Sequence, residues 1–236
     1  MKSRFLANMS HELRTPLTSI KGSLSLIATG VAGDVADDVA TLVGIADDSA
    51  KSLVELINDI LGFEKIKAGQ LVYNFAPVDI FAVLEQAIEA NRAYGEEYGV
   101  TFDLFEADIF GVRVNGDRGR LIQVMNNLLS NAAKYSVRGS RVVVFIEDQA
   151  STVRVNVRDF GQGIPEEFRG NIFSEFYQVY AKGADRPGGT GLGLSIAKSI
   201  VDSHGGTINY TTETGAGTTF YFDLLVLGED EQAEGV

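Results

Sequence analysis

A helical repeat of apolar side chains at the start of the chain is the strongest constraint on its fold. From residue 3 to 29, and again from 39 to 63, apolar residues recur at steps of three and four, the period of an amphipathic α-helix. The stretch Gly30–Asp38 interrupts the repeat, and Gly69 follows the basic end of the second helix. One helical hairpin cannot bury both apolar stripes, so the pattern predicts that two copies pair into a four-helix bundle.

The periodicity changes after Gln70, where shorter segments with alternating side chains begin. We expect strands at 71–75, 100–105, 112–115, 141–147, 152–159, 206–212 and 218–227, with helices at 80–94, 117–135 and 193–204. This order predicts a mixed α/β domain that finishes in an antiparallel hairpin. The expected organisation is a helical hairpin over 1–68, a linker or first strand over 69–76, an α/β domain over 77–227 and an acidic tail over 228–236.

Composition excludes several classes of function. The net charge of -12 disfavours nucleic acid as a partner, and the absence of cysteine excludes disulfides and Cys-based metal sites. Apolar runs such as Val142–Ile146 are far too short to cross a bilayer. We therefore expect a cytoplasmic chain without a membrane segment, either whole or as the cytoplasmic part of a longer protein.

A histidine with a neighbouring carboxylate stands on the first helix, in the segment HELRTPL of residues 11–17. An imidazole is mostly neutral at pH 7, so a ring nitrogen of His11 is available as a nucleophile and Glu12 can accept the second ring proton. Thr15 lies one turn along the same face and can position a water. Pro16 removes a helical hydrogen bond and loosens this turn. The same spacing also fits an exposed polar turn on a bundle helix.

The helix expected at 117–135 carries two carboxamides and an ammonium on one stripe, Asn127, Asn131 and Lys134. Mg²⁺ prefers oxygen ligands and keeps phosphate oxygens and waters around it, so neutral asparagine oxygens are adequate protein ligands. Lys134 can meet a phosphate as a point charge. This stripe therefore indicates a metal–polyphosphate site, although a solvated polar face has the same pattern.

Two glycine-rich segments add a nucleotide signature. Asp159 follows an apolar strand, and its carboxylate can accept a hydrogen bond from an amine such as that of adenine. Gly161 and Gly163 allow the backbone to pass close to a flat base. A strand-to-helix turn explains this pattern equally well. The segment 188–193 opens a helix, where free N–H groups favour phosphate. It has neither a Walker loop nor a dinucleotide fingerprint. The residues before it, 177–187, are expected to form a mobile flap with basic side chains.

In this order, the segments resemble the transmitter core of sensor histidine kinases over residues 3–227. Residues 11–17 are similar to the H box, 127–134 to the N box, 159–163 and 188–193 to the two glycine boxes, 173–176 to the F box, and 215–218 to the terminal glycine turn. The resemblance implies a dimeric helical-hairpin domain followed by an α/β sandwich of the Bergerat ATP-binding type.

The resemblance also implies an activity and its residues. ATP with Mg²⁺ phosphorylates His11, and the phosphoryl group then passes to an aspartate of a response regulator; the upstream sensor domain is missing from this chain. The implied catalytic residues are His11, Glu12 and Thr15, with Glu12 and Thr15 also fitting a phosphatase activity on the regulator. The implied metal ligands are Asn127 and Asn131. The implied nucleotide-binding residues are Asn127, Asn131, Lys134, Tyr135, Asp159, Gly161, Gly163, Ile164, Lys182, Arg186, Gly189, Thr190, Gly191, Leu192 and Gly193.

Two other functions remain open from the residues alone. An ATPase of the same fold would use hydrolysis to drive a conformational clamp, and it would have no helical histidine presented to the γ-phosphate. A signalling scaffold without enzymatic activity would bind nucleotide and dock partners, although Asn131 and Asp159 argue for a working site.

Overall fold

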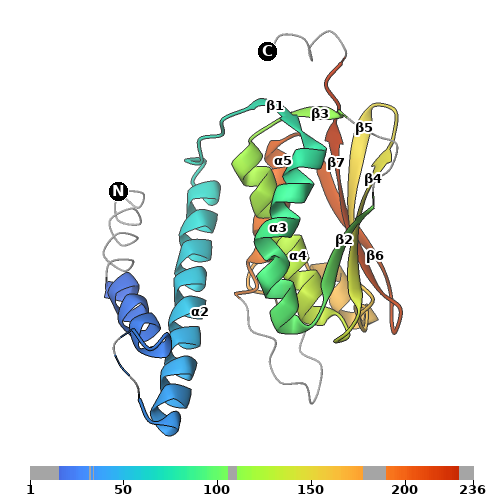
Figure 1. Ribbon diagram of the computed structural model, residues 1–236. Helices are drawn as coiled ribbons and strands as arrows, with labels where there is room; N and C mark the ends of the chain where they lie inside the picture. The colour runs from blue at the N-terminus through green and yellow to red at the C-terminus, as the bar shows by residue number, and fades with distance from the viewer. Residues whose placement is uncertain (1–15, 32, 34, 106–110, 178–189, 229–236) are drawn as a thin grey trace. The chain divides into compact units, whose positions relative to one another are not determined.

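The computed structural model describes residues 16–31, 33, 35–105, 111–177 and 190–228 (Figure 1). These residues fall into two units. The helical unit contains 16–71 together with 190–192, and the α/β unit contains 72–177 together with 193–228. The two units are described separately below.

The helical unit contains the hairpin that the apolar repeat predicts. Its first helix is described from residue 16 to 28, and α2 runs over Asp37–Lys67 (Figure 1). Acidic residues in the first turn of α2 and basic residues in its last turn both complement the helix dipole. Gly69 follows the helix with a φ of 64°, a left-handed conformation that glycine adopts without strain.

A broad apolar stripe on this hairpin remains exposed. Its members are 38% to 67% exposed: Ile20, Leu26, Val39, Leu42, Ile45, Leu53 and Leu56. Apolar side chains in such a row on a soluble protein are typical of an interaction surface. The single chain therefore leaves uncovered the stripe that its sequence repeat creates.

The α/β unit is built on a five-stranded sheet in the spatial order β2 (Thr101–Phe105), β4 (Arg141–Asp148), β5 (Thr152–Arg158), β7 (Gly217–Leu225) and β6 (Thr207–Glu213). The β2–β4 pair is parallel and the other pairs are antiparallel. A small antiparallel sheet joins β1 (Ala76–Asp79) to β3 (Arg113–Gly116). Helices α3 (Ile80–Tyr98), α4 (Arg118–Tyr135) and α5 (Gly193–Ser203) cover one face of the larger sheet (Figure 1). A 3₁₀ helix, η1, spans Glu166–Asn171.

The core lies between these helices and the sheet. Alternate residues of the central strands are buried, as the period of a half-buried strand requires: Val142, Val144 and Ile146 on β4, Val153, Val155 and Val157 on β5, and Phe220, Phe222 and Leu224 on β7. Helix α4 contributes Leu121, Val124, Met125, Leu128, Leu129, Ala132 and Ala133. The predicted order of a helical hairpin followed by a mixed α/β domain is confirmed.

Two predicted boundaries are wrong. No strand forms at 71–75, and the first strand is β1, which pairs with β3 from residue 76 onward. The alternation at 71–75 instead places Tyr73 and Phe75 against the ring of His204, with centroids 5.7 and 4.9 Å away. Helix α3 also continues to Tyr98, because Gly99, at a φ of 69°, is the residue that ends it.

No helix in the part of the chain that the structure describes is long and apolar enough to span a membrane.

Candidate nucleotide-binding site

Helix α4 carries the predicted carboxamide stripe on the side away from its apolar core. The amide nitrogen of Asn127 donates a 2.9 Å hydrogen bond to the carbonyl of Gly193, the first residue of α5. The bond anchors one half of the amide group and leaves Oδ1 to accept from, or coordinate, another group. Asn127 therefore links the helix that bears the stripe to the glycine-rich start of α5.

The other stripe residues differ in their surroundings. Asn131 is half-buried, and its side chain makes no hydrogen bond to any other residue that the structure describes. The ammonium group of Lys134 lies 5.9 Å from the centroid of the Tyr94 ring on α3, within the range of a cation–π contact. The structure therefore places Asn127, Asn131 and Lys134 on one helix, with Asn131 as the member whose amide is uncommitted among the described residues.

Asp159 is a buried carboxylate at the end of β5, with 4% of its surface exposed. Its Oδ1 accepts hydrogen bonds from the backbone N–H of Gly161 at 2.9 Å and of Thr218 at 3.1 Å. Burial raises the pKa of this carboxyl, and the two N–H donors oppose that rise. Because both bonds go to one oxygen, the second oxygen is held in a fixed direction.

The glycines of the first glycine box occupy positions where a side chain has no room. A β-carbon on Gly161 would lie 2.0 Å from the backbone carbonyl oxygen of Tyr135, at the end of α4. Gly163 has a φ of 68°, and a β-carbon there would lie 2.3 Å from the carbonyl oxygen of Glu213. Residues 161–163 therefore pack closely between the end of α4 and the β6–β7 hairpin. This packing places Tyr135 beside the loop that contains Asp159.

Two threonines on the β6–β7 hairpin complete this arrangement. Thr212 Oγ1 accepts from the backbone N–H of Ile164 at 2.9 Å and lies 2.9 Å from the hydroxyl of Thr218. Thr218 is 5% exposed. Thr212 was not predicted from the sequence, and nothing in the residue pattern of strand β6 distinguishes it.

A second polar cluster connects three segments: the end of α5, the segment before β1 that contains Asn74, and the start of α4. Asp117 caps α4 through Arg120 and also accepts from the backbone N–H of Asn74 at 3.0 Å. Its own N–H donates to Nε2 of His204 at 2.9 Å. Burial by itself raises the pKa of Asp117, but its backbone hydrogen bonds outweigh burial and lower it. Burial lowers the pKa of His204. The sequence analysis gave His204 no role.

The second glycine-rich segment is described only from Thr190 onward. Thr190 and Leu192 belong by their contacts to the helical unit, where Thr190 Oγ1 donates to Asp59 Oδ2 at 2.8 Å. Leu192 is fully buried and Gly191 has a φ of 71°. Six predicted site residues lie outside the described residues: His11, Glu12, Thr15, Lys182, Arg186 and Gly189.

Two family models match the chain. Residues 1–69 match the His Kinase A (phospho-acceptor) domain. Residues 116–227 match the histidine kinase-, DNA gyrase B-, and HSP90-like ATPase family. The second match contains the α4 stripe, Asp159 and the β6–β7 hairpin described above.

Named relatives agree with these matches. The histidine-protein kinase BarA of Escherichia coli K12 is 34% identical over 230 residues, and the sensor protein SrrB of Staphylococcus aureus is 33% identical over 226 residues. Each alignment covers 95% of this chain but only 24% of BarA and 38% of SrrB, so the chain spans a minor part of both proteins.

Solved structures give the same result. Full-length ShkA in complex with AMPPNP is 29% identical with a TM-score of 0.75, over 94% of this chain and 46% of ShkA. The catalytic domain of histidine kinase ThkA is 31% identical with a TM-score of 0.55, over 64% of this chain and 95% of that domain. The fold and the two matched domains define a transmitter core. The chain belongs to the sensor histidine kinases.

Proposed function

We propose that this chain is an ATP-dependent histidine kinase core that phosphorylates His11 and passes the phosphoryl group to a response regulator. The observation that carries the proposal is the geometry of Asp159. Two backbone N–H groups fix one of its oxygens, and the other is directed to accept a hydrogen bond from the exocyclic amine of adenine. Gly161 and Gly163 lie where a side chain would not fit, consistent with a close approach of base and backbone.

The proposed phosphate and metal groups are those of helix α4 and the second glycine box. The side-chain oxygens of Asn127 and Asn131 accept no hydrogen bond from the described residues, so they suit a hard cation such as Mg²⁺. When bound, Mg²⁺ would neutralise charge on the phosphate oxygens. Lys134 would serve phosphate, with Tyr135 and Ile164 beside the base. The remaining proposed nucleotide contacts are Lys182, Arg186, Gly189, Thr190, Gly191, Leu192 and Gly193.

Chemistry in this proposal takes place on the helical hairpin. A ring nitrogen of His11 attacks the γ-phosphorus, a P–N bond forms, and the bond to the β,γ-bridging oxygen breaks as ADP leaves. Glu12 takes the second ring proton. The phosphoryl group then moves to an aspartate of a response regulator, which restores His11. Thr15 would position a water for dephosphorylation of the regulator.

We also propose that the chain works as a homodimer. The exposed apolar stripe on the helical hairpin, which includes Leu42, Ile45 and Leu53, is the surface that a second copy would cover. The proposed domain limits are a hairpin over 1–68, a linker over 69–76, a catalytic domain over 77–227 and an acidic tail over 228–236. A cytoplasmic location follows from the proposed use of ATP.

Incubation with γ-labelled ATP and Mg²⁺ tests the proposal. We expect the chain to take up label that is labile in acid and stable in base, as a phosphohistidine is. The variant H11A should take up none while it still binds ATP in calorimetry. Label on another side chain, or no binding of adenine nucleotide, would contradict the proposal.

A further inference from the structure

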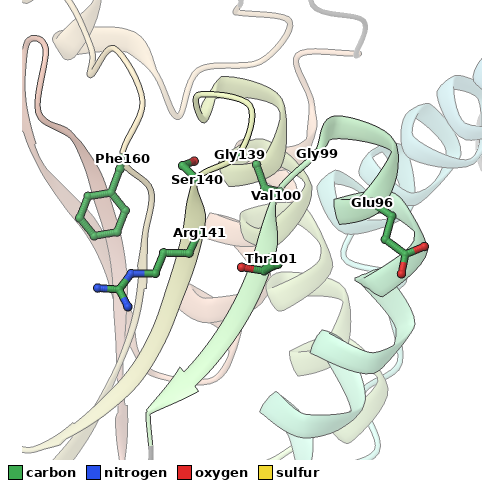
Figure 2. Close-up of a pocket in the computed structure, with 8 residues that line it drawn as sticks. All are labelled: Glu96, Gly99, Val100, Thr101, Gly139, Ser140, Arg141 and Phe160. Carbon is green, nitrogen blue, oxygen red and sulfur yellow. The ribbon is translucent and has the colours of Figure 1, made fainter.

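The α/β unit contains a pocket that none of the proposed nucleotide-binding residues lines. Its volume is about 730 Å³, within the range of small-molecule sites. It lies where the end of α3, the starts of β2 and β4, and the loop after β5 meet (Figure 2). Its lining includes Glu96, Gly99, Gly139, Ser140, Arg141 and Phe160.

Two glycines contribute backbone to one wall of this pocket, and the side chain of Arg138 packs over Gly99. Gly99 and Gly139 both have positive φ, at 69° and 86°, and the N–H of Gly139 donates to the carbonyl of Gly99 at 2.7 Å. The N–H of Thr101 likewise donates to the carbonyl of Ser140. Since these backbone groups already bond to one another, recognition of a ligand falls to the side chains.

The side chains gather positive charge at one end of the pocket. The guanidinium carbon of Arg141 lies 6.0 Å from the centroid of the Phe160 ring, and that of Arg158 lies 4.8 Å from it. Nη1 of Arg141 lies 3.9 Å from Oδ2 of Asp103, a separation longer than a hydrogen bond. Of the two, only Arg141 lines the pocket, and its guanidinium group can bind an oxyanion through parallel N–H donors.

The opposite side of the pocket has different chemistry. Glu96 is exposed there, and Figure 2 shows it across the pocket from Arg141 and Phe160. The pocket therefore has an anion-binding end with an aromatic face, and an acidic end.

We propose that this pocket binds a small organic anion that joins a flat ring to an oxyanion. The oxyanion would lie with Arg141, the ring would stack on Phe160, and Glu96 would repel a second anionic group and so fix the direction of binding. A nucleoside monophosphate and an aromatic carboxylate both have this chemistry. The inference concerns a site separate from the proposed ATP site.

Phe160 lines the pocket and is adjacent in the sequence to two residues of the proposed nucleotide site. Phe160 is joined on either side to Asp159 and Gly161, whose contact fixes the carboxylate. A ligand stacked on Phe160 restrains this loop, and so it should tighten ATP binding by severalfold. This second part rests on the proposed ATP site, whereas binding in the pocket does not.

Calorimetry on the whole chain, saturated with ADP and Mg²⁺ so that the ATP site is occupied, tests the binding. The probes are CMP, benzoate and inorganic phosphate. We expect CMP or benzoate to bind, and the ring anion that binds identifies the source of the ligand. The variants R141M and F160L should each weaken binding roughly tenfold or more. The matched charge control K198Q, on α5, should bind as the wild type does.

Three results would overturn the proposal: no binding of either ring anion, phosphate binding as tightly as the ring anions, or an affinity that R141M and F160L both leave unchanged. Thermal unfolding of each variant establishes that it is folded. The effector role is measured as the affinity for ATP with and without the ring anion. An unchanged ATP affinity would overturn that role, and a chain that binds the ring anion but no ATP would contradict the proposed function alone.

Discussion

The backbone N–H of Asp117 donates a 2.9 Å hydrogen bond to Nε2 of His204, which joins the start of α4 to the end of α5. Because Nε2 accepts this bond, the proton of the neutral ring lies on Nδ1, which donates to the carbonyl of Ile200 at 2.8 Å. His204 as a whole is 9% exposed. A second proton on the ring would remove the acceptor, so this junction requires a neutral imidazole.

Stability should therefore fall in mild acid. The pKa of His204 is lowered by burial below the value near 6.5 of an unfolded chain. Above pH ~6.5 the ring is neutral in both states and its contribution is complete. As the pH falls from there to the lowered pKa, only the unfolded chain binds the proton, and the free energy of unfolding decreases. Urea unfolding at several pH values over this window measures the slope.

The variant H204Q tests whether His204 causes that slope. Loss of the buried ring and its bonds should cost about 1–3 kcal/mol at pH 7.5, and the slope below pH ~6.5 should shrink. The control is K198Q, a substitution of a half-exposed side chain on α5 that keeps His204 and should keep the wild-type slope. Equal slopes for H204Q and wild type would show that other groups cause the acid sensitivity.

Replacement of Asp159 should separate nucleotide binding from stability. In D159N the Oδ1 acceptor for Gly161 and Thr218 can persist, but the outer oxygen becomes an NH₂ group that cannot accept from an amine. We expect ATP affinity to fall by roughly 1.5–3 kcal/mol, the range for a hydrogen bond to a charged group. Because burial raises the pKa of Asp159, its ionised form is destabilised, so the variant should unfold at no lower temperature. Calorimetry and thermal unfolding measure the two effects, and an unchanged ATP affinity would contradict the role of Asp159.

Replacement of Gly161 should damage both the fold and the site. A β-carbon in G161A would meet the Tyr135 carbonyl oxygen at 2.0 Å, so the loop must move and its bond to Asp159 is lost. We expect a loss of roughly 2–4 kcal/mol in unfolding free energy, together with weaker ATP binding. The control G170A adds a methyl group where no atom lies within 4 Å, and it should change stability by less than about 0.5 kcal/mol.

The fold could be predicted from the sequence because its elements have clear periods. The helical repeat predicted α2 to within a residue or two at each end, and the buried alternation of β4, β5 and β7 follows directly from their apolar residues. The segment 71–75 shows the limit of this reasoning. Its alternation has the period of a strand, but a strand needs a partner with open hydrogen bonds, and that partner begins to pair only at residue 76.

Part of the candidate site could likewise be predicted from the sequence, and part could not. Spacing on one helix placed Asn127 and Asn131 together, because the helical period is local information. Contacts between distant segments could not be read in this way: the hydrogen bond from Ile164 to Thr212 spans 48 residues, and that from Asp117 to His204 spans 87. Nothing in the local sequence distinguishes His204 from an exposed residue at a helix end.

The two asparagines of α4 should have separable roles. The side chain of Asn131 has no hydrogen bond to other described residues, so N131A should leave the free energy of unfolding within about 0.5 kcal/mol of wild type. Asn127 bonds to Gly193, so N127A should cost about 1 kcal/mol or more. If both oxygens hold the cation, each variant should lose ATP affinity in the presence of Mg²⁺ and match the wild type in EDTA.

The Mg²⁺ dependence is what separates a metal ligand from a structural asparagine. Calorimetry with ATP in Mg²⁺ and in EDTA gives the difference for each variant, and urea unfolding without nucleotide gives the stability. A loss of ATP affinity in N131A that is equal in both buffers would mean that Asn131 contacts the nucleotide directly and holds no cation. The variant S130A, one residue before Asn131, is the control: among the described residues the Ser130 hydroxyl bonds only to the Asn127 carbonyl, so the Mg²⁺ dependence of S130A should equal that of the wild type.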